Sequence, residues 1–106
     1  MDSDFRLSSP CSDAEFARYF ELRWQLLRAP WEQPRGSERD ELEADAFHLQ
    51  ARDRAGTLIG VGRLHHSDER QGQIRYMAVV EAWRGRGVGR ALLGRLEQQA
   101  RDWGLA

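Results

Sequence analysis

The sequence predicts an α+β fold in which helices are layered on a sheet (α/β/α), built as a single domain over residues 1–106. Three observations support this prediction. Residues 12–29 carry apolar side chains at helical spacing, and three strand-like runs follow one another between residues 47 and 80. A glycine-rich turn then leads into a second amphipathic helical stretch. The expected order is strand, helix, short helix, three strands and a final helix.

The first expected strand covers residues 5–8, with Phe5 and Leu7 on one face. The letters SDAE at residues 12–15 form a capping box, in which the Ser12 hydroxyl accepts from a helix amide and Glu15 reaches back. The helix should end near residue 29, because Pro30 disfavours helical geometry before it. Its apolar stripe is expected to consist of Phe16, Phe20, Trp24 and Leu27.

The segment from residue 30 to residue 46 contains two prolines, one glycine and many charged residues. This composition predicts a loop in which Ser37 caps a short acidic helix over residues 38–44. We interpret the loop as a solvated connection in preference to a lid that faces a substrate. The four tryptophans are interpreted as packing residues.

Residues 47–53 and 57–66 are expected to pair as a hairpin around a turn at residues 54–56. Gly60 and Gly62 weaken the second strand and indicate a bulge or the close approach of another backbone. His48 is expected on a sheet face. A polar turn separates this hairpin from a third strand over Ile74 to Val80. The final helix should present Val88, Leu92, Leu96 and Trp103 to the sheet.

Composition excludes several functions. All 16 basic residues are arginine, so neither a Schiff-base lysine nor a P-loop lysine is present. The formal charge of -1 argues against a general nucleic-acid binder. Cys11 is the single cysteine, which excludes an intrachain disulfide, and we interpret it as incidental more readily than as a reactive thiol. The N-terminus does not resemble a signal peptide, and no apolar run approaches the roughly 20 residues that span a bilayer, so a cytoplasmic location is expected and no membrane partner.

The glycine-rich turn is the strongest functional signal. Unpartnered amides and the helix dipole make the start of a helix an anion site, and Gly85, Gly87 and Gly89 would let phosphate oxygens approach the backbone. Flanking arginines add positive charge. The dinucleotide fingerprint does not fit, because its third glycine would fall on Arg90. A disordered Arg-Gly contact to nucleic acid is a weaker interpretation, because a strand and a helix flank the turn.

The letters RGRGVG at residues 84–89 match the Gln/Arg-x-x-Gly-x-Gly/Ala motif of the GCN5-related N-acetyltransferase (GNAT) superfamily. The stretch IRYMAV before it resembles the fourth strand of that family, and LRAPW and GVGRLHH also resemble bacterial members. The resemblance covers essentially the whole chain, but only the N-terminal portion of the family's domain. It implies an acyl-CoA N-acyltransferase-like fold, truncated after the helix that follows the fourth strand.

The resemblance also implies a function, which is acetyl transfer from acetyl-CoA to an amine of a small molecule or protein. In the family, main-chain groups of the fourth strand pair with the pantetheine arm, and a β-bulge in that strand opens the wedge where donor and amine meet. The loop amides hold the pyrophosphate. The cofactor-binding residues carried over are Met77, Ala78 and Val79 in the strand, and Arg84, Gly85, Arg86, Gly87, Val88, Gly89 and Arg90 in the loop.

The catalytic residues stay unassigned. The family's domain continues with a fifth strand and a later helix that commonly supplies a tyrosine acid, and neither Tyr19 nor Tyr76 lies in that motif. His65, His66 and Glu81 are weak base candidates, and a turn-side, exposed position is the commoner outcome for such histidines. No cluster has metal-ligand spacing.

Two expectations follow from the sequence ending after this helix. The strand over residues 74–79 should be an exposed, fairly apolar edge, so the chain is either a fragment or pairs with another copy, and we expect a homodimer or other self-association through this edge. The rival to an enzyme is a truncated, catalytically incomplete acetyl-CoA-binding or interaction module.

Overall fold

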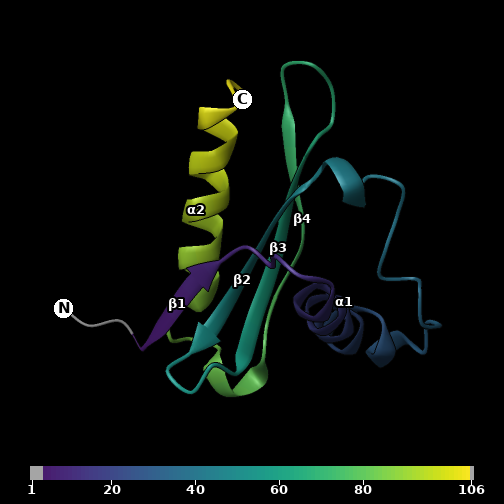
Figure 1. The fold of residues 1–106 in the computed structure, drawn as a ribbon, viewed down its shortest axis with the longest axis vertical. Helices are drawn as coiled ribbons and strands as arrows, with labels where there is room; N and C mark the ends of the chain where they lie inside the picture. Colours follow the sequence, from purple (N-terminus) through teal and green to yellow (C-terminus); the bar gives the residue numbers. More distant parts are fainter. Residues whose placement is uncertain (1–3, 106) are drawn as a thin grey trace.

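The computed structural model describes residues 4–105. Within them, four strands form one antiparallel sheet in the order β1-β2-β3-β4. Two α-helices lie on opposite sides of this sheet (Figure 1). The α+β expectation is therefore confirmed. The elements are β1 (Phe5–Ser8), α1 (Asp13–Leu27), η1 (Ala29–Trp31), η2 (Glu43–Asp45), β2 (Phe47–Asp53), β3 (Leu58–His66), β4 (Gly72–Val79), η3 (Glu81–Trp83) and α2 (Val88–Asp102), where η marks a 3-10 helix.

Helix α1 begins at the predicted cap, where the Ser12 hydroxyl accepts a hydrogen bond from the Glu15 amide at 3.1 Å. The reciprocal half of the capping box is replaced, because the Glu15 carboxylate accepts from the Gln50 amide and from Cys11. The predicted apolar stripe is only partly right. The most buried side chains of α1 are Tyr19, Phe20 and Arg23, two of which are polar.

The helix predicted over residues 38–44 is wrong, and only the single turn η2 forms there. Carboxylates bend this segment by accepting from its own backbone. Asp40 accepts from the Leu42 amide at 2.9 Å, and Glu43 accepts from the Asp40 amide at 3.1 Å. Ser37 does not act as a cap, because its hydroxyl donates to the Pro34 carbonyl. Side chains that bond local backbone compete with helix formation.

Helix α2 packs closely on β3. A Cβ atom at Gly62 would lie 2.9 Å from the Leu96 Cδ1 atom, and one at Gly60 would lie 3.1 Å from Leu92 Cδ1. Helix side chains approach both glycines most closely, and a Cβ at Gly60 would also lie 3.4 Å from the Ala78 carbonyl oxygen. The predicted bulge is present at Gly62, where the β3–β4 register shifts. The predicted inner face of α2 is confirmed, since Val88, Leu92 and Leu96 are buried in the core with Leu49, Ala51, Ile59 and Leu64.

Strand β4 lies at an edge of the described sheet and contains a β-bulge. Its pairing with β3 passes from Val61–Ala78 to Arg63–Arg75, so one β3 residue, Gly62, faces two β4 residues. One of those two, Tyr76, has a φ of 56°, which is uncommon for a residue with a side chain. The sequence predicted the edge, the glycines of β3 indicated a bulge, and the resemblance implied one in β4.

Trp31 corrects the expectation that every tryptophan is a packing residue, because it lies in η1 with 66% of its surface exposed. The other tryptophans are partly buried. Trp83 meets Phe5 edge to face with ring centroids 6.3 Å apart. Among residues 4–105, no helix has both the length and the apolar character needed to cross a membrane.

Candidate functional site

The turn between β4 and α2 is an exposed loop of backbone. Gly85 has a φ of 76° and Gly87 a φ of 89°, conformations that glycine adopts readily and other residues rarely do. A Cβ atom built at either glycine would have no heavy atom within 4 Å. The left-handed backbone explains why glycine is needed, and the open space in front of it leaves room for a ligand.

The start of α2 offers free hydrogen-bond donors. Gly87 is the N-cap residue, and its carbonyl accepts the first helical bond from the Ala91 amide at 3.0 Å. The amides of Val88, Gly89 and Arg90 precede that bond and have no acceptor among the described residues. These donors lie at the positive end of the helix dipole. The arrangement is suited to an anion, as the sequence predicted.

The three arginines of the turn have different surroundings. Arg84 folds back toward the sheet and donates through Nε to the Val79 carbonyl at 3.2 Å. Arg86 stacks on Trp83, with its guanidinium carbon 4.0 Å from the ring centroid. It also lies 3.9 Å from the Asp4 carboxylate. Arg90 is exposed in the first turn of α2. Only Arg84 therefore links the turn directly to β4.

The strand residues predicted to hold pantetheine lie beside this turn, in the last part of β4. The order along the chain is bulge, Met77, Ala78, Val79 and then the turn. Val80 closes the strand by donating to the Ile59 carbonyl at 2.9 Å. The predicted strand and loop residues follow one another along the chain from β4 into the turn, and Val88 among them is buried in the core. Their role in binding a cofactor stays a prediction.

A buried polar cluster lies on the α1 side of the sheet, next to the bulge, and sequence reasoning missed it. We call it the arginine cluster, and its members are Tyr19, Arg23, Asp40, Glu43, His48, Arg63 and His65. Arg23 and Arg63 are fully buried, and both donate to Glu43 Oε2 at 2.8 Å. Desolvated guanidinium groups need such partners. An arginine inside the apolar run of β3 was the signal that could have revealed the cluster.

Burial and neighbouring charges change the titration of this cluster. Hydrogen bonding from the Arg63 guanidinium lowers the pKa of Asp40 to about 2. Burial is the main cause that lowers the pKa of His48 and also that of His65. At neutral pH both histidines are therefore expected to be mostly uncharged.

The base candidates named from the sequence are not brought together. His65 is only 4% exposed, contrary to the expected open position, and its Nδ1 atom accepts from Arg63 at 3.1 Å. His66 is exposed and stacks on Trp103 with ring centroids 4.7 Å apart. Glu81 is exposed in η3. His48 lies on a sheet face, as expected, but is buried.

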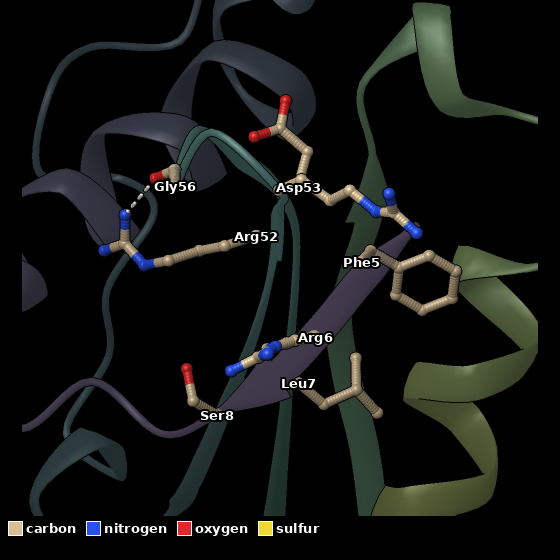
Figure 2. A pocket seen from close by; sticks show the side chains of 8 residues that line it. Phe5, Arg6, Leu7, Ser8, Arg52, Asp53 and Gly56 are labelled. Atoms are coloured by element: carbon tan, nitrogen blue, oxygen red, sulfur yellow. Dashed lines mark hydrogen bonds between the residues drawn. The ribbon is translucent and has the colours of Figure 1, made fainter. Parts of the chain in front are cut away.

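A surface groove lies elsewhere. Figure 2 shows it along β1 and the end of β2, where Arg52 donates to the Gly56 carbonyl at 2.7 Å. This is the edge of the sheet opposite to β4. The groove is therefore separate from the predicted cofactor surface. Within residues 4–105, no group of three or more His, Cys, Asp or Glu side chains could hold a metal ion.

Comparison with known proteins connects the fold to one family. The sequence model of the Acetyltransferase (GNAT) family matches residues 16–106. An acyl-CoA N-acyltransferase from Pseudomonas aeruginosa is 29% identical, with a TM-score of 0.77 over 95% of this chain and 73% of that chain. An acetyltransferase of the GNAT family from Staphylococcus aureus has a TM-score of 0.81 at 13% identity, over 95% of this chain and 69% of that one.

A third structure was solved with a ligand. A GNAT family acetyltransferase from Elizabethkingia anophelis, with acetyl-CoA bound, has a TM-score of 0.73 at 15% identity, over 98% of this chain and 62% of that chain. At this identity, as with the Staphylococcus aureus protein, the likeness concerns the fold alone.

Proposed function

Because the chain belongs to the acetyltransferase (GNAT) family, we propose that it uses acetyl-CoA as cosubstrate and transfers the acetyl group to an amine of a small molecule or protein. The observation that carries the proposal is the turn at the start of α2. Two left-handed glycines leave its backbone open, and three consecutive helix amides have no acceptor among the described residues. These amides suit the pyrophosphate of a CoA thioester.

The edge of β4 supports the same proposal. A pantetheine arm carries amides that can pair with a strand edge. Val80 donates to Ile59, so by the alternation of an antiparallel pair Ala78 faces β3, and Met77 and Val79 supply the outward main-chain partners between the bulge and the turn. The Val79 carbonyl accepts from Arg84. When Arg84 turns toward the pyrophosphate, that carbonyl becomes free for the arm. Arg84 thus connects the two parts of the proposed site.

The proposed reaction is a direct transfer. The neutral amine attacks the thioester carbonyl, the C–N bond forms, and the C–S bond breaks with loss of the CoA thiolate. The amine loses one proton to a base, and the thiolate gains one from an acid. The carbonyl oxygen gains negative charge during attack and needs a hydrogen-bond donor. The open main-chain edge at the bulge is where this chain can position the thioester. We assign neither the acid nor the base to a residue.

Calorimetric titration with acetyl-CoA tests the binding site. Gly87→Glu places a negative side chain in front of the free amides and should abolish measurable binding. Gly104→Glu is the matched control, because Gly104 also has a positive φ, of 75°, with open space around it, but lies past the other end of α2. Binding should survive in the control. Equal binding by wild type and Gly87→Glu would remove the loop from the proposal.

A thiol-release assay with a panel of amines separates an enzyme from a binding module. Thiol release that depends on the amine supports acetyl transfer. Binding of acetyl-CoA without any release would favour the alternative, a catalytically incomplete acetyl-CoA-binding module. Competition by RNA in place of CoA would favour an Arg-Gly contact to nucleic acid, and such binding should fall steeply with salt.

We also propose that the chain forms a homodimer through the Ile74–Val79 edge, because an unpaired strand edge readily pairs with another chain. The same edge is proposed to bind pantetheine, so acetyl-CoA should compete with the dimer. Light scattering should then give a dimer mass that falls toward the monomer as acetyl-CoA is added. A monomer at all concentrations without ligand would contradict this proposal.

A further inference from the structure

The residue opposite the bulge is tied to helix α1 by a buried hydrogen bond. The Tyr19 hydroxyl lies 2.8 Å from the carbonyl oxygen of Gly62, to which it can donate, across 43 residues of sequence. Gly62 is the β3 residue that faces two residues of β4. Tyr19 is fully buried, and α1 also packs on β4. A single side-chain hydroxyl therefore connects α1 to the strand position at which the β3–β4 register shifts.

The same hydroxyl has two further polar neighbours. Arg23 donates to it at 3.1 Å, and the Nδ1 atom of His48 lies 3.0 Å away. The Nε2 atom of His48 lies 2.8 Å from the Glu43 carbonyl. Burial raises the pKa of Tyr19 to about 12, so the hydroxyl keeps its proton at neutral pH.

Counting protons shows that these contacts compete. Three short contacts each need a proton: hydroxyl to Gly62, hydroxyl to His48, and His48 to the Glu43 carbonyl. The hydroxyl supplies one proton and a neutral imidazole supplies one. A protonated His48 satisfies all three contacts. A neutral His48 leaves one unmade, so the hydroxyl either donates to Gly62 or donates to the histidine.

The charged groups around His48 act in opposite directions. The Oε1 atom of Glu43 lies 3.9 Å from Nε2 of His48 and has no hydrogen-bond partner among the described residues. The negative charge of Glu43 favours the protonated form of His48. Arg23 on α1 and Arg63 on β3 oppose it, as does burial. The remaining wall around His48 is aromatic. The ring centroid of Phe16 lies 5.3 Å from that of His48, and the ring centroid of Phe20 lies 6.0 Å from it.

The bulge residue Tyr76 contacts the same group of side chains. The guanidinium carbon of Arg23, which donates to Tyr19, lies 4.4 Å from the centroid of the Tyr76 ring, and that of Arg63 lies 4.8 Å away. A positive φ at a residue with a side chain persists only where the surroundings hold it. Arg23 therefore contacts both the hydroxyl that binds Gly62 and the strained residue opposite Gly62.

We propose that Tyr19, supported by Arg23 and His48, is a positioning residue for acyl transfer. Its hydroxyl holds Gly62, and thereby sets the β4 bulge and the main chain of Met77 to Val79 that follows it. The catalytic part of this inference rests on the proposed function. The free amides of α2, proposed to hold the pyrophosphate, are separate from the bulge, whereas the main chain set by the hydroxyl is proposed to hold the pantetheine arm. Loss of the hydroxyl should therefore slow the transfer more than it weakens CoA affinity.

The test compares two variants. Tyr19→Phe removes only the hydroxyl, whereas Phe20→Leu loosens the same core and keeps the Tyr19 hydroxyl. In Tyr19→Phe we expect kcat for thiol release to fall about tenfold, the order of one hydrogen bond, and CoA affinity to fall by a smaller factor than kcat. Phe20→Leu should keep kcat within about twofold of wild type. Equal losses of kcat in the two variants would overturn the proposal.

Two readouts do not depend on activity. Amide hydrogen exchange at Tyr76 to Val79, without ligand, should be faster in Tyr19→Phe than in Phe20→Leu. The NMR titration of His48 should move to lower pH in Tyr19→Phe, because the protonated imidazole loses the acceptor for its Nδ1–H. Unchanged exchange and titration would overturn the positioning role even if acetyl transfer is found. If wild type does not bind acetyl-CoA, the proposed function fails, while these readouts still decide whether the hydroxyl holds the bulge.

Should Tyr19→Phe fail to fold, His48→Asn serves as the second variant. Its side-chain amide can donate to the Tyr19 oxygen without titrating, which leaves the hydroxyl proton for Gly62. Exchange at Tyr76 to Val79 should then be independent of pH between about 5 and 8, after correction for the intrinsic exchange rate, whereas wild type should show a dependence. A pH dependence equal to that of wild type would contradict the shared proton.

Discussion

Arg63 on β3 and Asp40 in the loop between α1 and β2 form an ion pair with two hydrogen bonds. NH1 lies 2.7 Å from Oδ1, and NH2 lies 3.0 Å from Oδ2. Arg63 is fully buried, whereas the Asp40 side chain is 20% exposed. Parallel bonds of this kind are among the strongest between side chains. The pair joins the loop between α1 and β2 to the core, so the loop is not merely a solvated connection.

The ion pair predicts a loss of stability in acid. The pKa of Asp40 is about 2 in the folded protein and 3.8 in its reference state, so folding favours the charged form. The stabilisation is complete above about pH 4 and disappears as the pH falls to about 2, and it amounts to about 2 kcal/mol. Urea unfolding at a series of pH values measures it. Asp40→Asn should lose this component of the pH dependence, and an unchanged slope would contradict the assignment.

Asp40→Asn should also destabilise the protein at neutral pH, because it leaves the buried Arg63 with one carboxylate, that of Glu43. Breaking a buried pair typically costs about 3 kcal/mol or more. Glu41→Gln is the control, since Glu41 is an exposed neighbour in the same loop, and it should change stability by less than about 0.5 kcal/mol. Equal unfolding free energies for the two variants would show that the pair adds nothing.

Gly62→Ala should destabilise the protein by about 1–3 kcal/mol. The added methyl would lie 2.9 Å from Leu96 Cδ1, which is too close, so the Leu96 side chain or α2 must shift, whereas its 3.5 Å separation from Met77 Cγ is an ordinary contact. Chemical unfolding measures the loss. A neutral effect would mean that Leu96 can change rotamer inside the core without cost.

Gly94→Ala should act in the opposite direction. Gly94 lies in the middle of α2 on its exposed side, and an added Cβ would meet no heavy atom within 4 Å. Alanine in place of glycine in a helix interior stabilises by about 0.5–1 kcal/mol. Thermal unfolding should show a higher midpoint, and a lower one would indicate that this face of α2 is covered in solution.

Cys11 should react slowly with iodoacetamide at pH 8. Its thiol lies 3.4 Å from the Glu15 carboxylate, and this hydrogen bond is the main cause that raises the pKa of Cys11. Only the thiolate is nucleophilic, so less of the reactive form is present. Glu15→Gln should speed alkylation. Glu21→Gln, at a position further along α1, should leave the rate unchanged. Fast alkylation of the wild type would reopen the interpretation of Cys11 as a reactive thiol.

Local signals predicted most of the fold. The Ser12 cap, the hairpin from residue 47 to residue 66 and the inner face of α2 depend on neighbours a few positions away, and the structure confirms each of them. The predicted site followed from the glycine spacing, because left-handed backbone at Gly85 and Gly87 is a local requirement. The failed helix over residues 38–44 shows the limit. Its Asp40 and Glu43 carboxylates pair with arginines that lie 20 or more residues away, as in the Glu43–Arg63 pair.

The sequence by itself determined the order of the elements, the glycine-rich turn and the family. Periodicity, caps and turn residues act through neighbouring positions, so they can be recognised before any fold is known. Tertiary structure alone decided that Arg23, Arg63 and His65 are buried and that Tyr19 meets Gly62 at the bulge. Polar side chains become buried only where partners from other elements satisfy their hydrogen bonds and charges. Those partners come from α1, the loop after it, β2 and β3, and only folding brings them together.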